Sequence, residues 1–180
     1  MFRSLSVRQM LLAISVGCVA LLAFGVYLQH VVGLEPCPMC IVQRYAMILV
    51  ALCAGTAALF RGRGAHVAGG VGILLFAGFG AFVAARQSWL QWYPPETASC
   101  GRDFYGMIET FPLSRVVPMI FRGSGDCSKV DWTFLGGSIA NWSFVWFCVM
   151  FAAAALLVAR QLGRGGPGSR WQAMRSRIPT

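Results

Sequence analysis

Four long uncharged, apolar runs dominate the chain. They cover residues 9–34, 45–60, 67–85 and 142–159. A helix that crosses a bilayer needs about 20 apolar residues, and these runs predict spans at approximately 10–30, 41–60, 66–86 and 142–160. The second run has only 16 residues, so we expect its helix to begin near Pro38 or Ile41. The first run is too long for the apolar part of a cleaved signal peptide, and we expect it to be a retained helix.

The segments between the runs predict two external loops, at residues 31–40 and 87–141. Within the second loop, residues 104–121 are apolar but interrupted by Pro112 and Pro118, a pattern that favours short helices lying on the membrane surface. The sequence therefore predicts an all-α integral membrane protein: a single four-transmembrane-helix bundle over residues 1–162. Residues 163–180 are basic and rich in Gly, Ser and Pro, which is typical of a disordered tail.

The composition agrees with a membrane protein. Hydrophobic residues make up 57% of the 180 residues and charged residues only 12%, about half the charged fraction of a typical soluble domain. The net charge is +9, which taken alone would suggest a nucleic-acid partner.

The position of the charges gives a different explanation. The N-terminus, the 61–66 turn and the tail carry nine arginines and no acidic residue. The other two loops, with the flanking Arg44 and Arg86 counted among them, hold six basic and all six acidic residues. Positively charged loops stay in the cytoplasm, so we expect both termini to be cytoplasmic. The basic charge then reflects topology and not nucleic-acid binding.

The principal chemical motif is Cys37-Pro38-Met39-Cys40, followed by Arg44. If Pro38 opens a helix, Cys37 lies at its N-terminus, where the helix dipole favours a thiolate. Spacings of three and four then place Cys37, Cys40 and Arg44 on one helical face. We interpret the motif as a redox centre that faces a membrane quinone.

Two further cysteines, Cys100 and Cys127, fall in the second external loop. Alone they would suggest a loop-stabilising disulfide, but beside an external CxxC a second active pair is the better hypothesis. All four cysteines could instead ligate zinc. We favour redox chemistry because the second pair is not a CxxC and because thiols pair on an oxidising face. A simple structural disulfide at the CxxC is the other alternative. Cys18, Cys53 and Cys148 lie within spans and are interpreted as packing residues.

These residues together resemble the DsbB family of bacterial inner-membrane proteins. The resemblance covers nearly the whole chain up to the tail. It rests on the CPMC motif with Arg44 and on three further segments, Leu90-Gln91-Trp92-Tyr93-Pro94, Gly125-Asp126-Cys127 and Trp132-Thr133-Phe134-Leu135-Gly136. One departure concerns the end of the third span, where some relatives carry a histidine and this chain has Arg86-Gln87.

The resemblance implies a function and a location. The protein would reoxidise a periplasmic thioredoxin-like dithiol oxidase (DsbA-like) and pass the electrons to ubiquinone or menaquinone. Its external cysteines would be periplasmic.

The resemblance also implies a role for each site residue. Cys100, in a disulfide with Cys127, looks like the position that the partner attacks, and Cys127 would then attack Cys37. Cys40 would be freed as a thiolate beside the quinone, with Arg44 stabilising the thiolate or the quinone oxygen.

A different class of function stays open from the residues alone. A four-helix membrane protein with external disulfides could be a binding or assembly subunit without turnover. Quinone reduction by the purified protein with a dithiol donor distinguishes the two.

Overall fold

A computed structural model of the protein describes residues 6–34, 36–94, 130 and 132–163. Its elements are α1 (Val7–His30), α2 (Pro38–Leu59), α3 (Arg63–Trp92), β1 (Thr133–Phe134), β2 (Gly137–Ser138) and α7 (Ile139–Gly163). Each of the four helices is long and apolar enough to cross a membrane. The prediction of a four-helix membrane protein is therefore confirmed.

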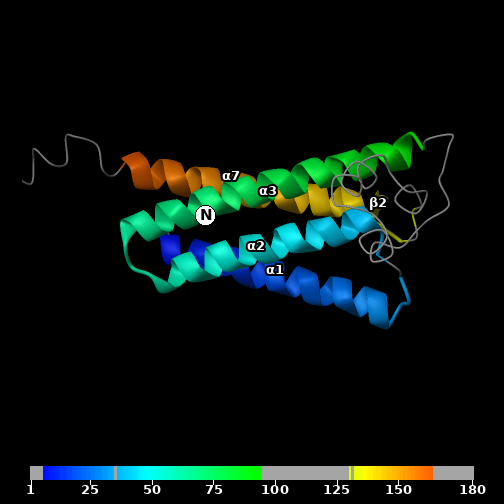
Figure 1. Ribbon diagram of the computed structural model, residues 1–180, viewed down its shortest axis with the longest axis horizontal. Coiled ribbons are helices and arrows are strands. Elements are labelled where there is room, and N and C mark those ends of the chain that lie inside the picture. The colour runs from blue at the N-terminus through cyan, green and yellow to red at the C-terminus, as the bar shows by residue number, and fades with distance from the viewer. Residues whose placement is uncertain (1–5, 35, 95–129, 131, 164–180) are drawn as a thin grey trace, which may run out of the picture.

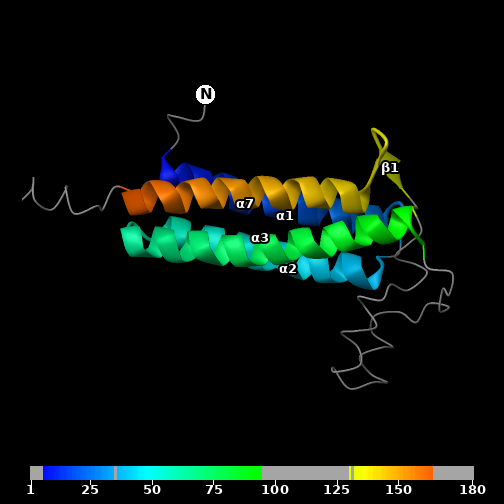
Figure 2. The same cartoon turned by 90° about the horizontal axis from the view of Figure 1, so that it is seen from above.

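The helices run alternately up and down along one long axis (Figure 1). α3 packs against both α2 and α7, and α1 packs mainly against α2. Contact between α1 and α7 is slight, and we call the line where these two helices face each other the α1–α7 seam. The start of α2, the end of α3 and the β-hairpin gather at one end of the bundle, and the 60–62 turn lies at the other (Figures 1 and 2).

The observed helices are longer than most of the apolar runs that predicted them. α2 begins at Pro38, the earlier of the two expected starts, α3 continues to Trp92 rather than 86, and α7 begins at Ile139 rather than 142. Hydropathy identifies only the part of a helix that is apolar enough for the hydrocarbon core of the bilayer. The ends of the helix are determined by capping residues and by polar turns near the membrane surface. The predicted surface helices within 104–121 and the predicted disordered tail from 164 onward lie outside the described residues.

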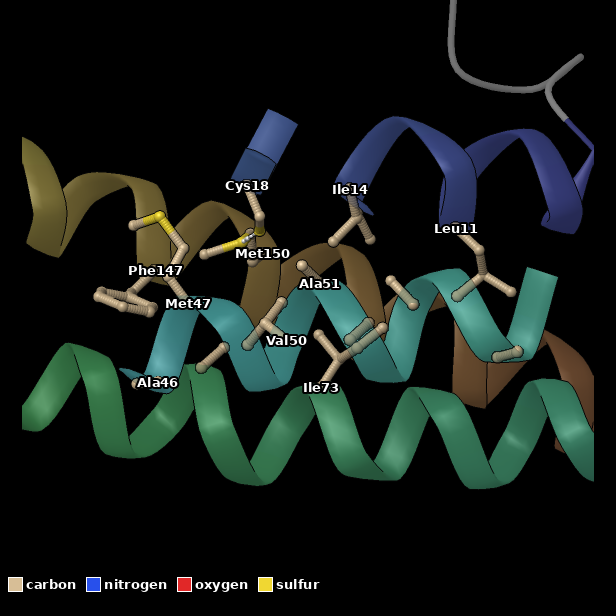
Figure 3. Close-up of a cluster of buried hydrophobic side chains, with 14 of the residues drawn as sticks. Leu11, Ile14, Cys18, Ala46, Met47, Val50, Ala51, Ile73, Phe147 and Met150 are labelled. Atoms are coloured by element: carbon tan, nitrogen blue, oxygen red, sulfur yellow. Dashed lines mark hydrogen bonds between the residues drawn. The ribbon is translucent and has the colours of Figure 1, made fainter. Parts of the chain in front are cut away.

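Small side chains and a few large ones fill the core (Figure 3). Cys18 is fully buried, and its Sγ donates a hydrogen bond to the Met150 Sδ at 3.2 Å. This contact agrees with a packing role for Cys18, because an unpaired buried cysteine behaves as a small apolar residue. The labelled core residues from all four helices are Leu11, Ile14, Cys18, Ala46, Met47, Val50, Ala51, Ile73, Phe147 and Met150.

The close approach of α3 to α7 depends on Gly80. A Cβ atom at this position would overlap the ring of Phe147, which is itself fully buried. Small residues at helix interfaces allow this kind of contact in membranes, where van der Waals packing stabilises helix association.

We predict that Gly80→Ala destabilises the bundle, because the Phe147 ring must leave its site. Overpacking of this kind costs about 1–3 kcal/mol, and the measurement is the thermal unfolding midpoint of the purified protein in detergent. Gly78→Ala is the matched control, since its added methyl would meet Phe151 at an ordinary 3.5 Å. Equal midpoints for the two variants would contradict the prediction.

Candidate redox site and cavity

The first turn of α2 positions the CxxC. Cys37 is the N-cap residue and Pro38 occupies the first helical turn, as the sequence predicted. The Cys37 Sγ accepts a hydrogen bond from the Cys40 backbone N–H at 3.3 Å, and the two sulfur atoms lie 2.8 Å apart. The free N–H groups and positive dipole of a helix N-terminus stabilise negative charge on sulfur. This turn therefore holds two cysteines within bonding reach of each other at a place that favours a thiolate.

A glutamine from α3 completes this arrangement. The Gln87 Nε2 donates to the Cys37 Sγ at 3.3 Å and to the Cys40 Sγ at 3.2 Å. The Gln87 Oε1 accepts from the Gln43 Nε2 at 2.6 Å, and a longer contact of 3.7 Å joins Cys40 Sγ to the same oxygen. Both glutamines are buried, with 3% and 5% of their surface exposed for Gln87 and Gln43. Buried amides have to be hydrogen-bonded. Here Gln87 bonds to the two sulfur atoms, and Gln43 and Gln87 bond to each other.

Arg44 lies one turn beyond Cys40 and reaches across to α1. Its Nη1 donates to the Gln29 Oε1 at 2.6 Å, and its Nη2 donates to the Gly25 backbone oxygen at 3.1 Å. These bonds use two of the five N–H groups of a guanidinium. Arg44 therefore anchors α1 to α2 while keeping donors for a bound molecule.

The cysteines and Arg44 line one cavity of about 480 Å³. Its walls come from α1, α2, the end of α3, the hairpin and the start of α7, and most of them are apolar. This volume lies within the usual range of about 300–1,000 Å³ for small-molecule sites. Because α1 and α7 both contribute walls, the cavity lies at the α1–α7 seam.

The β-hairpin forms an aromatic side of this cavity. Trp132 and Phe134 stack with ring centroids 6.0 Å apart, and Trp132 meets Phe24 of α1 edge-on at 6.2 Å. The Trp142 Nε1 donates to the Phe134 backbone oxygen at 2.9 Å. Offset and edge-on aromatic pairs are favourable, so these contacts fix the hairpin against both α1 and α7.

The turn of the hairpin explains part of its sequence. Leu135 and Gly136 form a two-residue connection with φ of 50° and 79°, as a type I′ turn requires. Gly137 lies directly beneath the indole of Trp142, whose Nε1 would be 2.9 Å from a Cβ atom at that position. The Ser138 Oγ donates to the Gln91 Oε1 at 2.6 Å, which ties the hairpin to α3.

The structure thus brings together three of the five site residues that the sequence predicted: Cys37, Cys40 and Arg44. Cys100 and Cys127 lie outside the described residues. Among the described residues no group of three or more His, Cys, Asp or Glu side chains is placed to hold a metal, but the zinc alternative also depended on the undescribed pair.

The sequence interpretation missed Gln43 and the contacts of Gln87. Gln87 had been noted only as a departure from the family pattern. Gln43 follows Cys40 by three residues and so faces the same side of the helix, a signal that could have identified it. The hairpin was also missed, because two-residue strands are too short to show an alternating pattern.

Comparison with known proteins identifies the family. The model of the family described as "Disulfide bond formation protein DsbB" matches residues 7–157. The chain is 71% identical over 153 residues to a disulfide bond formation protein B from Polaromonas naphthalenivorans, covering 85% of this chain and 92% of that relative. It is 68% identical to the protein of that name from Acidovorax sp. strain JS42, covering 89% and 91% of the two chains. The chain therefore belongs to the DsbB family of disulfide bond formation proteins.

Proposed function

We propose that the protein is a thiol:quinone oxidoreductase of the bacterial inner membrane. It would take electrons from the dithiol of a periplasmic thioredoxin-like oxidase and pass them to ubiquinone or menaquinone, which sustains disulfide-bond formation. The observation that carries the proposal is the position of Cys37 and Cys40 in the wall of an apolar cavity that Arg44 also lines.

The cavity suits a quinone head group in shape and chemistry. A quinone is a flat ring with two carbonyl oxygens, and when bound it accepts two electrons and two protons. Apolar and aromatic walls suit the ring, and the remaining N–H groups of Arg44 suit an oxygen that gains negative charge in a low-dielectric site. A lipid-soluble molecule would reach the cavity from the side, along the α1–α7 seam, where contact between the helices is slight.

The residues of the chain would relay the electrons by a series of disulfide exchanges. The partner's thiolate attacks Cys100, which forms a mixed disulfide and releases Cys127 as a thiolate. Cys127 then attacks Cys37, the Cys37–Cys40 bond breaks, and its electron pair leaves on Cys40. The partner's second thiolate then breaks the mixed disulfide, which forms the partner's own disulfide and frees Cys100. Cys100 attacks Cys127 in the Cys37–Cys127 bond and releases Cys37. The Cys37–Cys40 disulfide would re-form as two electrons and two protons pass to the quinone.

The charges at the two ends of the bundle support the orientation. Arg8, Arg61, Arg63 and Arg160 lie near the helix ends opposite the CxxC. Because basic residues stay on the cytoplasmic side, this end would be cytoplasmic and the cysteine end periplasmic.

We predict that Arg44→Ala slows quinone reduction and raises the KM for quinone. A hydrogen bond to a charged group contributes about 1.5–3 kcal/mol, so kcat/KM for quinone should fall about tenfold or more. The measurement is steady-state quinone reduction by the purified protein with a dithiol donor.

Arg86→Ala is the control for this variant. It removes an arginine from the same end of the bundle that does not line the cavity, and its kinetics should match those of the unsubstituted protein. Unchanged KM and kcat in Arg44→Ala would leave Arg44 as an anchor between α1 and α2 only.

We predict that the two cysteine pairs have separable roles, which tests the proposed function as a whole. Replacing Cys100 and Cys127 by alanine should abolish oxidation of the protein partner, because the accessible disulfide is lost. The same variant should keep some quinone reduction with dithiothreitol, which is small enough to reach Cys37 and Cys40 directly.

Replacing Cys37 and Cys40 by alanine should abolish both activities, since no route to the quinone remains. Appreciable quinone reduction by that variant would show that the electron path is wrong. Absence of quinone reduction in the unsubstituted protein would favour a non-catalytic membrane subunit.

A further inference from the structure

The two buried glutamines beside the CxxC, Gln43 and Gln87, are hydrogen-bonded to each other, and Gln87 also donates to both sulfur atoms. We propose that Gln87 is a catalytic hydrogen-bond donor to the CxxC sulfur that becomes negatively charged, and that Gln43 is the positioning residue that aims it. This inference rests on the proposed function, because it concerns the thiolate that the electron relay creates.

The need for a donor follows from the surroundings of the sulfurs. Breaking the Cys37–Cys40 bond leaves an electron pair on Cys40, which is half-buried and lies beside the buried Cys37 and Gln87. An anion away from water is costly unless hydrogen bonds satisfy it. An amide NH2 has two hydrogens, and the 3.3 Å and 3.2 Å contacts supply one donor direction to each sulfur. Gln87 can therefore stabilise the leaving sulfur without moving.

Gln43 determines which end of the Gln87 amide faces the sulfurs. The Gln43 NH2 donates to the Gln87 oxygen at 2.6 Å, so that oxygen is held toward Gln43 and the Gln87 NH2 is directed to the two sulfur atoms. Rotating the amide by half a turn would place an oxygen against the thiolate and two NH2 groups against each other. Both contacts would be repulsive, so the bond from Gln43 favours the orientation in which the Gln87 NH2 faces the sulfurs.

The Gln43–Gln87 pair also stays uncharged while the cysteines are oxidised and reduced. An amide has no titration near neutral pH, in contrast to an imidazole or a carboxylate. Donation from Gln87 therefore persists at any pH at which the protein works, and it adds no further charge to the membrane interior.

The test is the midpoint reduction potential of the Cys37–Cys40 pair, measured against a thiol–disulfide buffer in a Cys100→Ala/Cys127→Ala background. Gln87→Leu removes the donor, so the reduced state loses stability and the potential should become more negative. A tenfold change in the equilibrium constant corresponds to about 30 mV, and this is the expected size of the shift. The rate of alkylation of the reduced pair should fall by about the same factor, because the thiolate is the reactive form.

Further variants keep the test valid if Gln87→Leu folds poorly. Gln87→Glu has nearly the same shape but replaces the donor by an acceptor, so its potential should shift in the same direction and further. Gln43→Leu should shift the potential in the same direction, and Gln43→Leu/Gln87→Leu should shift it no more than Gln87→Leu alone.

Ser88→Ala is the control: it removes a neighbouring buried hydroxyl that bonds to none of the described groups, and its potential should not change.

Potentials in Gln87→Leu and Gln87→Glu equal to that of the background protein would overturn the inference. Additive shifts from Gln43 and Gln87 would overturn the positioning role of Gln43, since independent sites add and coupled sites do not. These measurements need neither quinone nor a protein partner, so their failure is distinct from a failure of the proposed function.

Discussion

The structure is organised around the hydrogen bonds that converge on the sulfur atoms of Cys37 and Cys40 at one end of the bundle. Cys37 is buried, so the donors that a negative charge on these sulfurs would need have to come from the protein itself. The N-terminus of α2 supplies the Cys40 backbone N–H to Cys37, and Gln87 of α3 supplies its NH2 to both sulfurs. The first contact lies within α2 itself, whereas the Gln87 contacts depend on the register of α2 against α3. Small residues in the core allow these two helices to approach closely.

Arg44 links the sulfur site to the cavity. Its bonds to Gln29 and Gly25 hold the end of α1 near α2, whereas α1 has few contacts with α7 apart from the Cys18–Met150 bond in the core. The hairpin closes the same end through the aromatic contacts of Trp132, Phe134 and Trp142. A cavity thus forms at the end of the bundle where α1 and α7 make little contact, and the two cysteines line it.

Much of this arrangement could be predicted from sequence because its signals are local. Four apolar runs predicted the helices, and Pro38 after Cys37 predicted a cysteine at a helix N-terminus. The position of Arg44 on the same helical face as Cys40 was predicted from the spacing of the two residues. The Gln43–Gln87 pair could not be predicted in this way, since it joins residues 44 positions apart on two helices whose relative register is set by packing. The hairpin depends on a positive φ at Leu135, for which leucine gives no signal. The positions of Cys100 and Cys127 remain predictions.

The central claim is that the cavity beside Cys37 and Cys40 receives the quinone. Photo-crosslinking with an azido-quinone, followed by peptide mapping, tests it most directly. The account predicts labelling on the cavity walls of α1 and α7, near Phe24 and Trp142, and loss of that labelling when excess ubiquinone is present. Labelling that ubiquinone does not compete away, or that falls on exposed residues of α3 such as Leu75 and Phe79, would contradict it.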